Sequence, residues 1–172
     1  NAGVSSSGMI AEIDFAEWRR VMSVNLDGAF LTLRAAMRAI QAGSGPRAIV
    51  VTGSVAGMKP EPGVAAYGSS KAAVIQLAKI AAKEAAPEGI RVNAIAPGGV
   101  DTPIWDEMPF FADLAASEGS REAAINAMAK MATPLGRYAS AEEIAAQVAF
   151  LLSEDAATIT GAVLISDGGY SL

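Results

Sequence analysis

Three short runs rich in apolar and β-branched residues alternate along the chain with longer segments of helical periodicity. The runs occupy residues 48–52, 90–96 and 162–166. Their apolar residues mostly follow one another instead of alternating with polar ones, which is typical of strands buried on both faces. Buried strands separated by helices predict a parallel sheet with helices on both sides. The pattern therefore favours an α/β fold with a doubly wound parallel sheet.

The segments between these runs have the apolar spacing of amphipathic helices. They cover residues 14–40, 64–86, 141–153 and, in part, a long insertion at 102–133. Asp14 and Ser140 are expected to be N-caps, because a glutamate follows each of them at the capping-box distance. A break in the first helix is expected near Asn25, since asparagine is costly inside an apolar helix.

The composition excludes several kinds of chemistry. The chain has no Cys and no His, which rules out disulfides, thiol catalysis, histidine-ligated metals and mechanisms that use imidazole. Its net charge of −5 argues against a nucleic-acid partner, which would require a basic face. No apolar run approaches the ~20 residues of a membrane span, and no signal segment opens the chain. We expect one cytoplasmic domain of 172 residues with no metal and no membrane partner.

Ligands of parallel sheets bind beyond the carboxyl ends of the strands, which directs attention to Ser54 and to the turn at 97–99. Tyr67 and Lys71 lie four residues apart in a helix and so share one face. Tyrosine is a poor base at neutral pH, and a neighbouring cation stabilises its phenolate. A hydroxyl and such a phenol together suit ketone–alcohol interconversion. Each signal alone has a structural alternative: a surface pair, a turn residue at Ser54, or a helix break at Asn25.

Several short motifs occur together in the order and spacing of one known family. They are Asn-Ala-Gly at 1–3, Val-Asn-Leu at 24–26, Thr-Gly-Ser at 52–54, Tyr-Gly-Ser-Ser-Lys at 67–71, Arg-Val-Asn at 91–93, the turn at 97–102 and Asp-Gly-Gly at 167–169. Over its whole length the chain resembles the classical short-chain dehydrogenase/reductase family. The resemblance implies a Rossmann-type fold and hydride transfer between NAD or NADP and a carbonyl or secondary alcohol.

The resemblance also implies a role for each matched residue. Tyr67 would be the general acid and base, Lys71 would stabilise its phenolate and bind the nicotinamide ribose, and Ser54 would bind the substrate oxygen. Asn25 would hold a water that relays protons to Lys71. The residues implied for cofactor binding are Asn1, Ala2, Gly3, Tyr67, Lys71, Pro97, Gly98, Val100 and Thr102.

One part of the family pattern is missing from the sequence. The glycine-rich phosphate turn and the residue that selects NAD or NADP belong to βα units that would precede Asn1, amounting to roughly 80 to 90 residues. We therefore expect the C-terminal two-thirds of the fold, with an exposed apolar sheet edge. Two functions are compatible with this: an oxidoreductase, or a non-catalytic remnant acting as a structural or interaction protein. A remnant would be expected to lose one of Asn25, Ser54, Tyr67 and Lys71, which favours the oxidoreductase.

The insertion at 102–133 matches the family's substrate lid. Its apolar and aromatic residues between Pro103 and Leu114 predict a hydrophobic, cyclic or steroid-like alcohol or ketone, unless they only pack the lid onto the domain. The resemblance further implies a homo-oligomer, either a dimer or a tetramer. Helices 25–40 and 64–86 would pair across one interface, and residues 141–172 would form a second.

Overall fold

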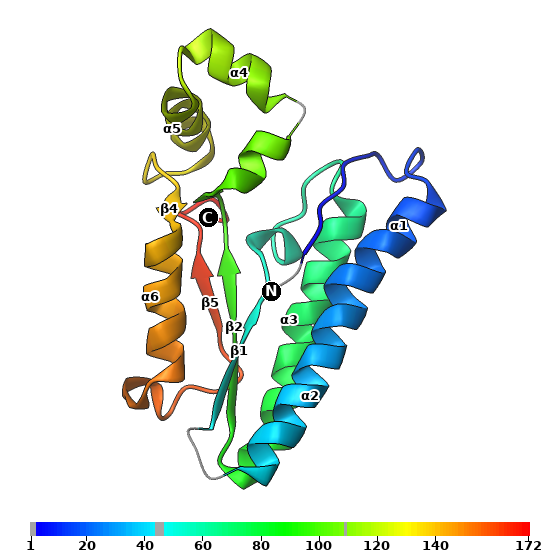
Figure 1. The fold of residues 1–172 in the computed structure, drawn as a ribbon, viewed down its shortest axis with the longest axis vertical. Coiled ribbons are helices and arrows are strands. Elements are labelled where there is room, and N and C mark those ends of the chain that lie inside the picture. Colours follow the sequence, from blue (N-terminus) through cyan, green and yellow to red (C-terminus); the bar gives the residue numbers. More distant parts are fainter. Residues whose placement is uncertain (1–2, 44–46, 109) are drawn as a thin grey trace.

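The computed structural model describes residues 3–43, 47–108 and 110–172. Its centre is a parallel sheet of β1 (Ala48–Thr52), β2 (Arg91–Pro97) and β5 (Val163–Ser166), in the order β1-β2-β5 (Figure 1). The three strands coincide with the three runs expected from the sequence. Residues 92–96 of β2 are all buried, as expected for a strand with neighbours on both sides and helices on both faces.

Helices cover both faces of this sheet (Figure 1). α2 (Gly28–Ala42) and α3 (Ala65–Ala85) lie on one side, and α6 (Ala141–Leu152) lies on the other. The main core forms between α2, α3 and β2, and its buried members are Leu33, Ala78, Ala81, Ala82, Ala85, Ile90, Val92 and Ala94. Alanines dominate this core because small side chains let α3 lie close to the sheet. The doubly wound α/β prediction is confirmed.

The first predicted helix is continuous but contains a distortion at the expected place. α1 (Phe15–Met22) passes into a π-helical turn, Ser23–Asp27, and then directly into α2. Asp14 caps α1 by accepting a hydrogen bond from the Ala16 amide (3.0 Å). The capping box expected there is wrong, because the Glu17 carboxylate pairs with Arg20 instead (2.7 Å).

A capping box does form at the start of α6. The Ser140 hydroxyl accepts from the Glu143 amide, and the Glu143 carboxylate accepts from the Ser140 amide (3.2 and 2.9 Å). The buried Asn93 in β2 forms hydrogen bonds through both its amide nitrogen and its amide oxygen. Its side chain donates to Ile159 O (2.8 Å) and accepts from the Ala162 amide (3.0 Å), which ties β2 to the loop that precedes β5. The Arg-Val-Asn motif therefore has a structural purpose.

Residues beyond the carboxyl end of β2 form a separate helical layer (Figure 1). It consists of the 3-10 segment Pro103–Glu107, α4 (Phe111–Glu118) and α5 (Arg121–Ala132), and its small core contains Phe111, Ala124, Ile125 and Met128. Two short strands, β3 (Val100–Asp101) and β4 (Ala139–Ser140), connect this layer to the start of α6. The expectation of partial helix is confirmed, whereas the β3–β4 pair was not foreseen. Further 3-10 turns are Val55–Gly57, Ala86–Glu88 and Glu154–Ala156.

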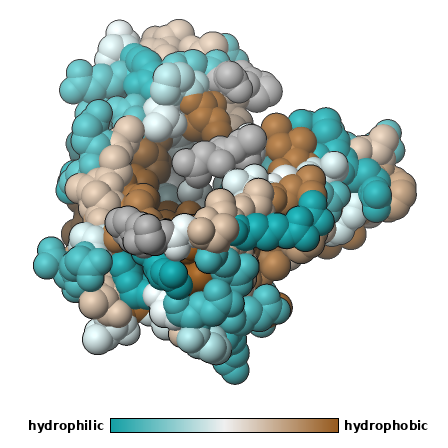
Figure 2. Space-filling model, turned by 60° about the horizontal axis from the view of Figure 1, so that its bottom comes forward, coloured by the Kyte–Doolittle hydropathy of each residue, from teal (hydrophilic) through white to brown (hydrophobic). Residues whose placement is uncertain are grey.

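Within the part of the chain that the structure describes, β1 lies at one edge of the sheet. Within the described ranges β1 pairs with β2 alone, and all five of its residues are only half-buried. A groove of about 240 Å³ lies between this strand and α2. Figure 2 shows hydrophobic surface within a hollow of the molecule. No helix in the described ranges is long and apolar enough to cross a membrane.

Candidate active site

Lys71 is a buried charged residue: like Asp167, it is only 8% exposed. It lies in the second turn of α3, one turn after Tyr67, and its ammonium nitrogen lies 5.8 Å from the centre of the Tyr67 ring. The ammonium donates a hydrogen bond to Thr52 O at the end of β1 (3.3 Å). Burial lowers the pKa of the Lys71 ammonium, since desolvation disfavours its charged form.

Asn25 connects the start of the chain to α3. It lies in the π-helical turn, a distortion often found at functional sites, and is 3% exposed. Its Oδ1 accepts from the Val4 amide (2.8 Å), and its Nδ2 donates to Val4 O (2.9 Å) and to Ser70 Oγ (3.0 Å). The Ser70 hydroxyl donates in turn to Tyr67 O (2.7 Å). The cost of burying an asparagine is thus met by three hydrogen bonds.

Gly3 lies beside both Asn25 and Lys71. A Cβ added at Gly3 would stand 3.7 Å from Asn25 Oδ1 and 3.8 Å from Lys71 Nζ. Asn1 and Ala2, which were also expected to bind cofactor, lie outside the described residues.

The loop after β1 brings Ser54 to the same end of α3. Ser54 is buried, and its hydroxyl accepts from the Ala56 amide (3.2 Å), so it caps the 3-10 turn that follows. Two glycines allow this loop to lie directly on α3. A Cβ at Gly57 would stand 2.6 Å from the Ala72 amide nitrogen, and a Cβ at Gly68 would stand 2.9 Å from Ala56 O. Any larger residue at either position would push the loop off the helix.

The turn after β2 is packed from behind by two aromatic rings. A Cβ at Gly99 would overlap the Tyr138 ring, and Tyr138 stacks on Trp105 with ring centres 5.4 Å apart. The Trp105 indole donates to Val100 O (2.8 Å). Gly98 packs on Asp167, where a Cβ would stand 2.7 Å from the Asp167 Cβ. The turn that carries Pro97, Gly98, Val100 and Thr102 is therefore supported by the lid and by the C-terminal segment.

The carboxyl end of the sheet thus brings together most of the residues singled out in the sequence. Gly3, Asn25, Tyr67 and Lys71 are joined by the contacts above, and Ser54 follows the strand whose end binds Lys71. Sequence reasoning missed Ser70, Gly57 of the Ser54 loop and Gly68 of α3. Ser70 was accessible in principle, because it lies three residues after Tyr67 and one turn of helix brings such positions together.

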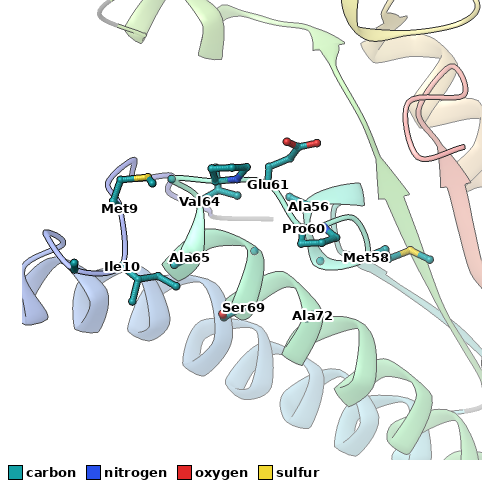
Figure 3. Close-up of a pocket in the computed structure, with 15 residues that line it drawn as sticks. Met9, Ile10, Ala56, Met58, Pro60, Glu61, Val64, Ala65, Ser69 and Ala72 are labelled. Carbon is teal, nitrogen blue, oxygen red and sulfur yellow. The ribbon is translucent and has the colours of Figure 1, made fainter.

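A larger groove, of about 620 Å³, lies on the opposite side of α3. Figure 3 shows Met9 and Ile10 on one rim, Met58 and Pro60 on the other, and Ala65, Ser69 and Ala72 of α3 beneath them. These α3 positions are about half a turn away from those of Tyr67 and Lys71. The groove is therefore distinct from the candidate active site.

Comparison with known proteins agrees with this arrangement. Residues 1–171 match the family described as enoyl-(acyl carrier protein) reductase. Cis-4-hydroxycyclohexanecarboxylate dehydrogenase of Sinomonas cyclohexanicum is 38% identical over 172 residues, which are 99% of this chain and 64% of that protein. A solved 4-hydroxyisoleucine dehydrogenase complexed with NADH superposes with a TM-score of 0.83 at 28% identity, over 99% of this chain and 65% of that one.

A second solved structure, described as a short chain dehydrogenase/reductase family protein, has a TM-score of 0.80 at 32% identity and covers 100% of this chain and 66% of that one. The chain thus spans about two-thirds of the length of the proteins it matches. The matched sequence, the parallel sheet and the Tyr–Lys pair on α3 lead to one conclusion: the chain belongs to the short-chain dehydrogenase/reductase family.

Proposed function

We propose that the protein is an NAD(P)-dependent oxidoreductase that interconverts a secondary alcohol and a ketone by hydride transfer. The observation that carries the proposal is the buried Lys71 ammonium, held on Thr52 O one helical turn from Tyr67. A buried cation beside a phenol stabilises the phenolate that a tyrosine base needs.

The residues at this end of the sheet are suited to a nicotinamide cofactor. An ammonium group has three donors, and within the described ranges Lys71 uses one of them, on Thr52 O. The other donors suit the hydroxyls of a ribose. We propose that Gly3, Tyr67, Lys71, Pro97, Gly98, Val100 and Thr102, with Asn1 and Ala2, line the cofactor. The cofactor supplies the hydride chemistry, and the protein supplies orientation and proton transfer.

In the proposed reaction Tyr67 Oη protonates the ketone oxygen in reduction and removes the alcohol proton in oxidation. Ser54 donates a hydrogen bond to the same oxygen and polarises the carbonyl. Lys71 stabilises the phenolate form of Tyr67. Asn25 is proposed to hold the water that relays protons to Lys71. The hydrogen bonds of Asn25 to Val4 and Ser70 support a second role for this side chain, because they hold the Val4 backbone and α3 together next to Lys71.

We propose a hydrophobic or cyclic substrate bound under the lid formed by residues 102–133. Four lid residues, Trp105, Met108, Phe111 and Leu114, are used in the lid's own core. Ile104 and Phe110 remain 49% and 52% exposed. These two are free to contact a substrate, and a relative named for a hydroxycyclohexane carboxylate fits such a surface. A substrate panel that favours polyols over cycloalkanols would contradict this part of the proposal.

We further propose a homo-oligomer, either a dimer or a tetramer. α2 and α3 expose Phe30, Leu31 and Ile80, and the 620 Å³ groove at the start of α3 is also open and apolar. On the other side of the sheet, Phe150 of α6 and Ile165 of β5 are partly exposed and suit a second interface. A monomeric mass in light scattering would contradict the proposal. Cytoplasmic location stays a prediction, as does the assignment of residues 1–172 to a single domain.

The decisive experiment compares two tyrosine variants of the purified protein. Coenzyme-dependent oxidation of a cycloalkanol panel is followed by NAD(P)H absorbance, and coenzyme binding is followed by fluorescence. Tyr67→Phe should abolish turnover and leave coenzyme binding intact. Tyr170→Phe, which removes one exposed hydrogen bond to Glu61 (2.8 Å), is the matched control and should remain active. Turnover retained by Tyr67→Phe would exclude Tyr67 as the acid and base.

The alternative is a non-catalytic structural or interaction protein. If the wild-type protein shows neither turnover nor a coenzyme-dependent fluorescence change, the alternative replaces the oxidoreductase.

A further inference from the structure

One arginine joins three separate parts of the lid and of the turn after β2. Arg121, the first residue of α5, donates to Asp101 Oδ1 (2.7 Å), Asp106 Oδ1 (2.9 Å) and Thr102 O (2.9 Å). Its guanidinium also lies 5.9 Å from the centre of the Phe111 ring in the lid core. Asp101 ends β3, Thr102 follows it, and Asp106 belongs to the 3-10 segment. A single side chain therefore holds residues 101–106 against α5.

The geometry of these contacts requires arginine in particular. The three bonds leave from Nε, Nη1 and Nη2, so every nitrogen of the planar fork has its own acceptor. The lysine ammonium is a compact point charge without this planar fork, so it would replace the three directed bonds only in part. The Arg121 side chain is 39% exposed, and exposed ion pairs contribute little to global stability. The main effect of these contacts is therefore to position residues 101–106 and not to raise the global stability of the protein.

We propose that Arg121 is a positioning residue, which fixes Thr102 and the 3-10 segment over the active site. For its effect on catalysis the proposal rests on the proposed function, because Thr102 is assigned there to the cofactor. After loss of Arg121 the segment is still held by the Trp105–Tyr138 stack, the Trp105–Val100 hydrogen bond, the two-residue β3–β4 pair and the packing of Trp105 and Met108 in the lid core. The segment then moves, and binding of cofactor and substrate weakens.

Trp105 provides a readout of this movement that is independent of catalysis. The chain has two tryptophans, Trp18 and Trp105, so Trp18→Phe leaves Trp105 as the single fluorescent indole. Trp105 is half-buried on the Tyr138 ring, inside the segment that Arg121 holds. In this background Arg121→Met should shift the emission to longer wavelength and raise the acrylamide quenching constant at least twofold. The emission wavelength and quenching constant of Arg121→Lys should lie between those of the protein with Arg121 and those of Arg121→Met.

Arg20→Met is the matched control, because Arg20 also binds a carboxylate through two nitrogens (2.7 and 2.8 Å to Glu17) but lies on α1. Circular dichroism at the working temperature checks that all variants are folded. If acrylamide quenches the Trp105 fluorescence equally in Arg121→Met and Arg20→Met, the positioning role is overturned, whether or not the protein is an enzyme.

The kinetic arm uses the same variants. Arg121→Met should raise KM for coenzyme about tenfold and lower kcat by a smaller factor, with partial recovery in Arg121→Lys. A mobile Trp105 with unchanged KM and kcat would also overturn the proposal, because positioning would then have no catalytic consequence. Absence of turnover in the wild type would contradict the proposed function, while the fluorescence arm would still decide whether Arg121 holds the segment.

Discussion

Replacement of Asn25 by alanine tests the central contact of the candidate site. The change removes three hydrogen bonds, two to the Val4 backbone and one to Ser70 Oγ, from a side chain that is 3% exposed. A typical internal hydrogen bond contributes about 0.5–1.5 kcal/mol, so the three together contribute about 1.5–4.5 kcal/mol. Alanine has the better helix propensity and offsets up to about 0.7 kcal/mol of this loss. We expect the free energy of unfolding to fall by about 1–4 kcal/mol.

Urea unfolding followed by circular dichroism measures this difference. Asn126→Ala on α5 is the control, because Asn126 is an exposed asparagine on a helix and its replacement should change stability by less than about 0.7 kcal/mol. Ser70→Ala removes one of the three bonds, so the double variant with Asn25→Ala should show a coupling energy of about 1 kcal/mol. An Asn25→Ala protein as stable as Asn126→Ala would refute the reasoning that Asn25 anchors the start of the chain to α3.

Four further predictions concern the Ser54 loop and two charged groups. Gly57→Ala should destabilise the protein by about 1–3 kcal/mol in urea unfolding, since the added Cβ would meet the backbone of α3. Gly28→Ala is the control and should be neutral or stabilising, because the nearest atom to its added Cβ is 3.8 Å away. Equal effects of the two substitutions would contradict the close approach of the Ser54 loop to α3. Burial lowers the pKa of Lys71 in the folded state, so the unfolded chain binds more protons between that lowered pKa and the ordinary lysine pKa. The free energy of unfolding of the wild type, relative to that of Lys71→Met, should therefore rise with pH across this interval. A difference that does not change with pH would exclude burial of the charge. Hydrogen bonds from Arg137 lower the pKa of Glu143 to about 2. The contribution of this carboxylate to the free energy of unfolding should therefore be complete above pH 4.5 and disappear as the pH falls towards 2. Acid unfolding of the wild type and of Glu143→Gln measures this contribution, and identical acid unfolding would count against the Arg137–Glu143 pair. Lys71→Ala should also move the pH optimum of turnover upward, and an unchanged optimum would exclude its support of the tyrosine base.

The elements of the fold were predictable because their signals are local. The run at residues 92–96 is buried throughout, as its composition predicts for a strand with helices on both faces, whereas Ala48–Thr52 at the edge of the sheet is only half-buried. The α6 capping box likewise depends on four consecutive residues, Ser140 to Glu143. At Asp14 the same pattern gave an N-cap without a capping box: Asp14 accepts from the Ala16 amide, and the Glu17 carboxylate binds Arg20. A motif identifies possible partners, and the neighbours present decide between them.

The site was predictable only as a set of residues. Helical periodicity alone places Tyr67 and Lys71 on one face, because four residues are close to one turn. Nothing local shows that Asn25 binds Val4 and Ser70, since these contacts join segments 21 and 45 residues apart. The lid illustrates the same limit. Its apolar residues look alike in the sequence, yet Phe111 is buried in the lid core and Phe110 is exposed.

By itself the sequence determined the class of fold, the order of its elements, and the tyrosine and lysine that share one face of a helix. These properties follow from periodicity, capping and the burial of apolar runs, which act over a few residues. Only the tertiary structure decided that Lys71 is buried on Thr52 O, that Gly57 lets the Ser54 loop lie on α3, and that Arg121 joins three parts of the lid. The physical reason is that hydrogen bonds and steric contacts depend on distances in space, which chain packing sets between residues far apart in sequence.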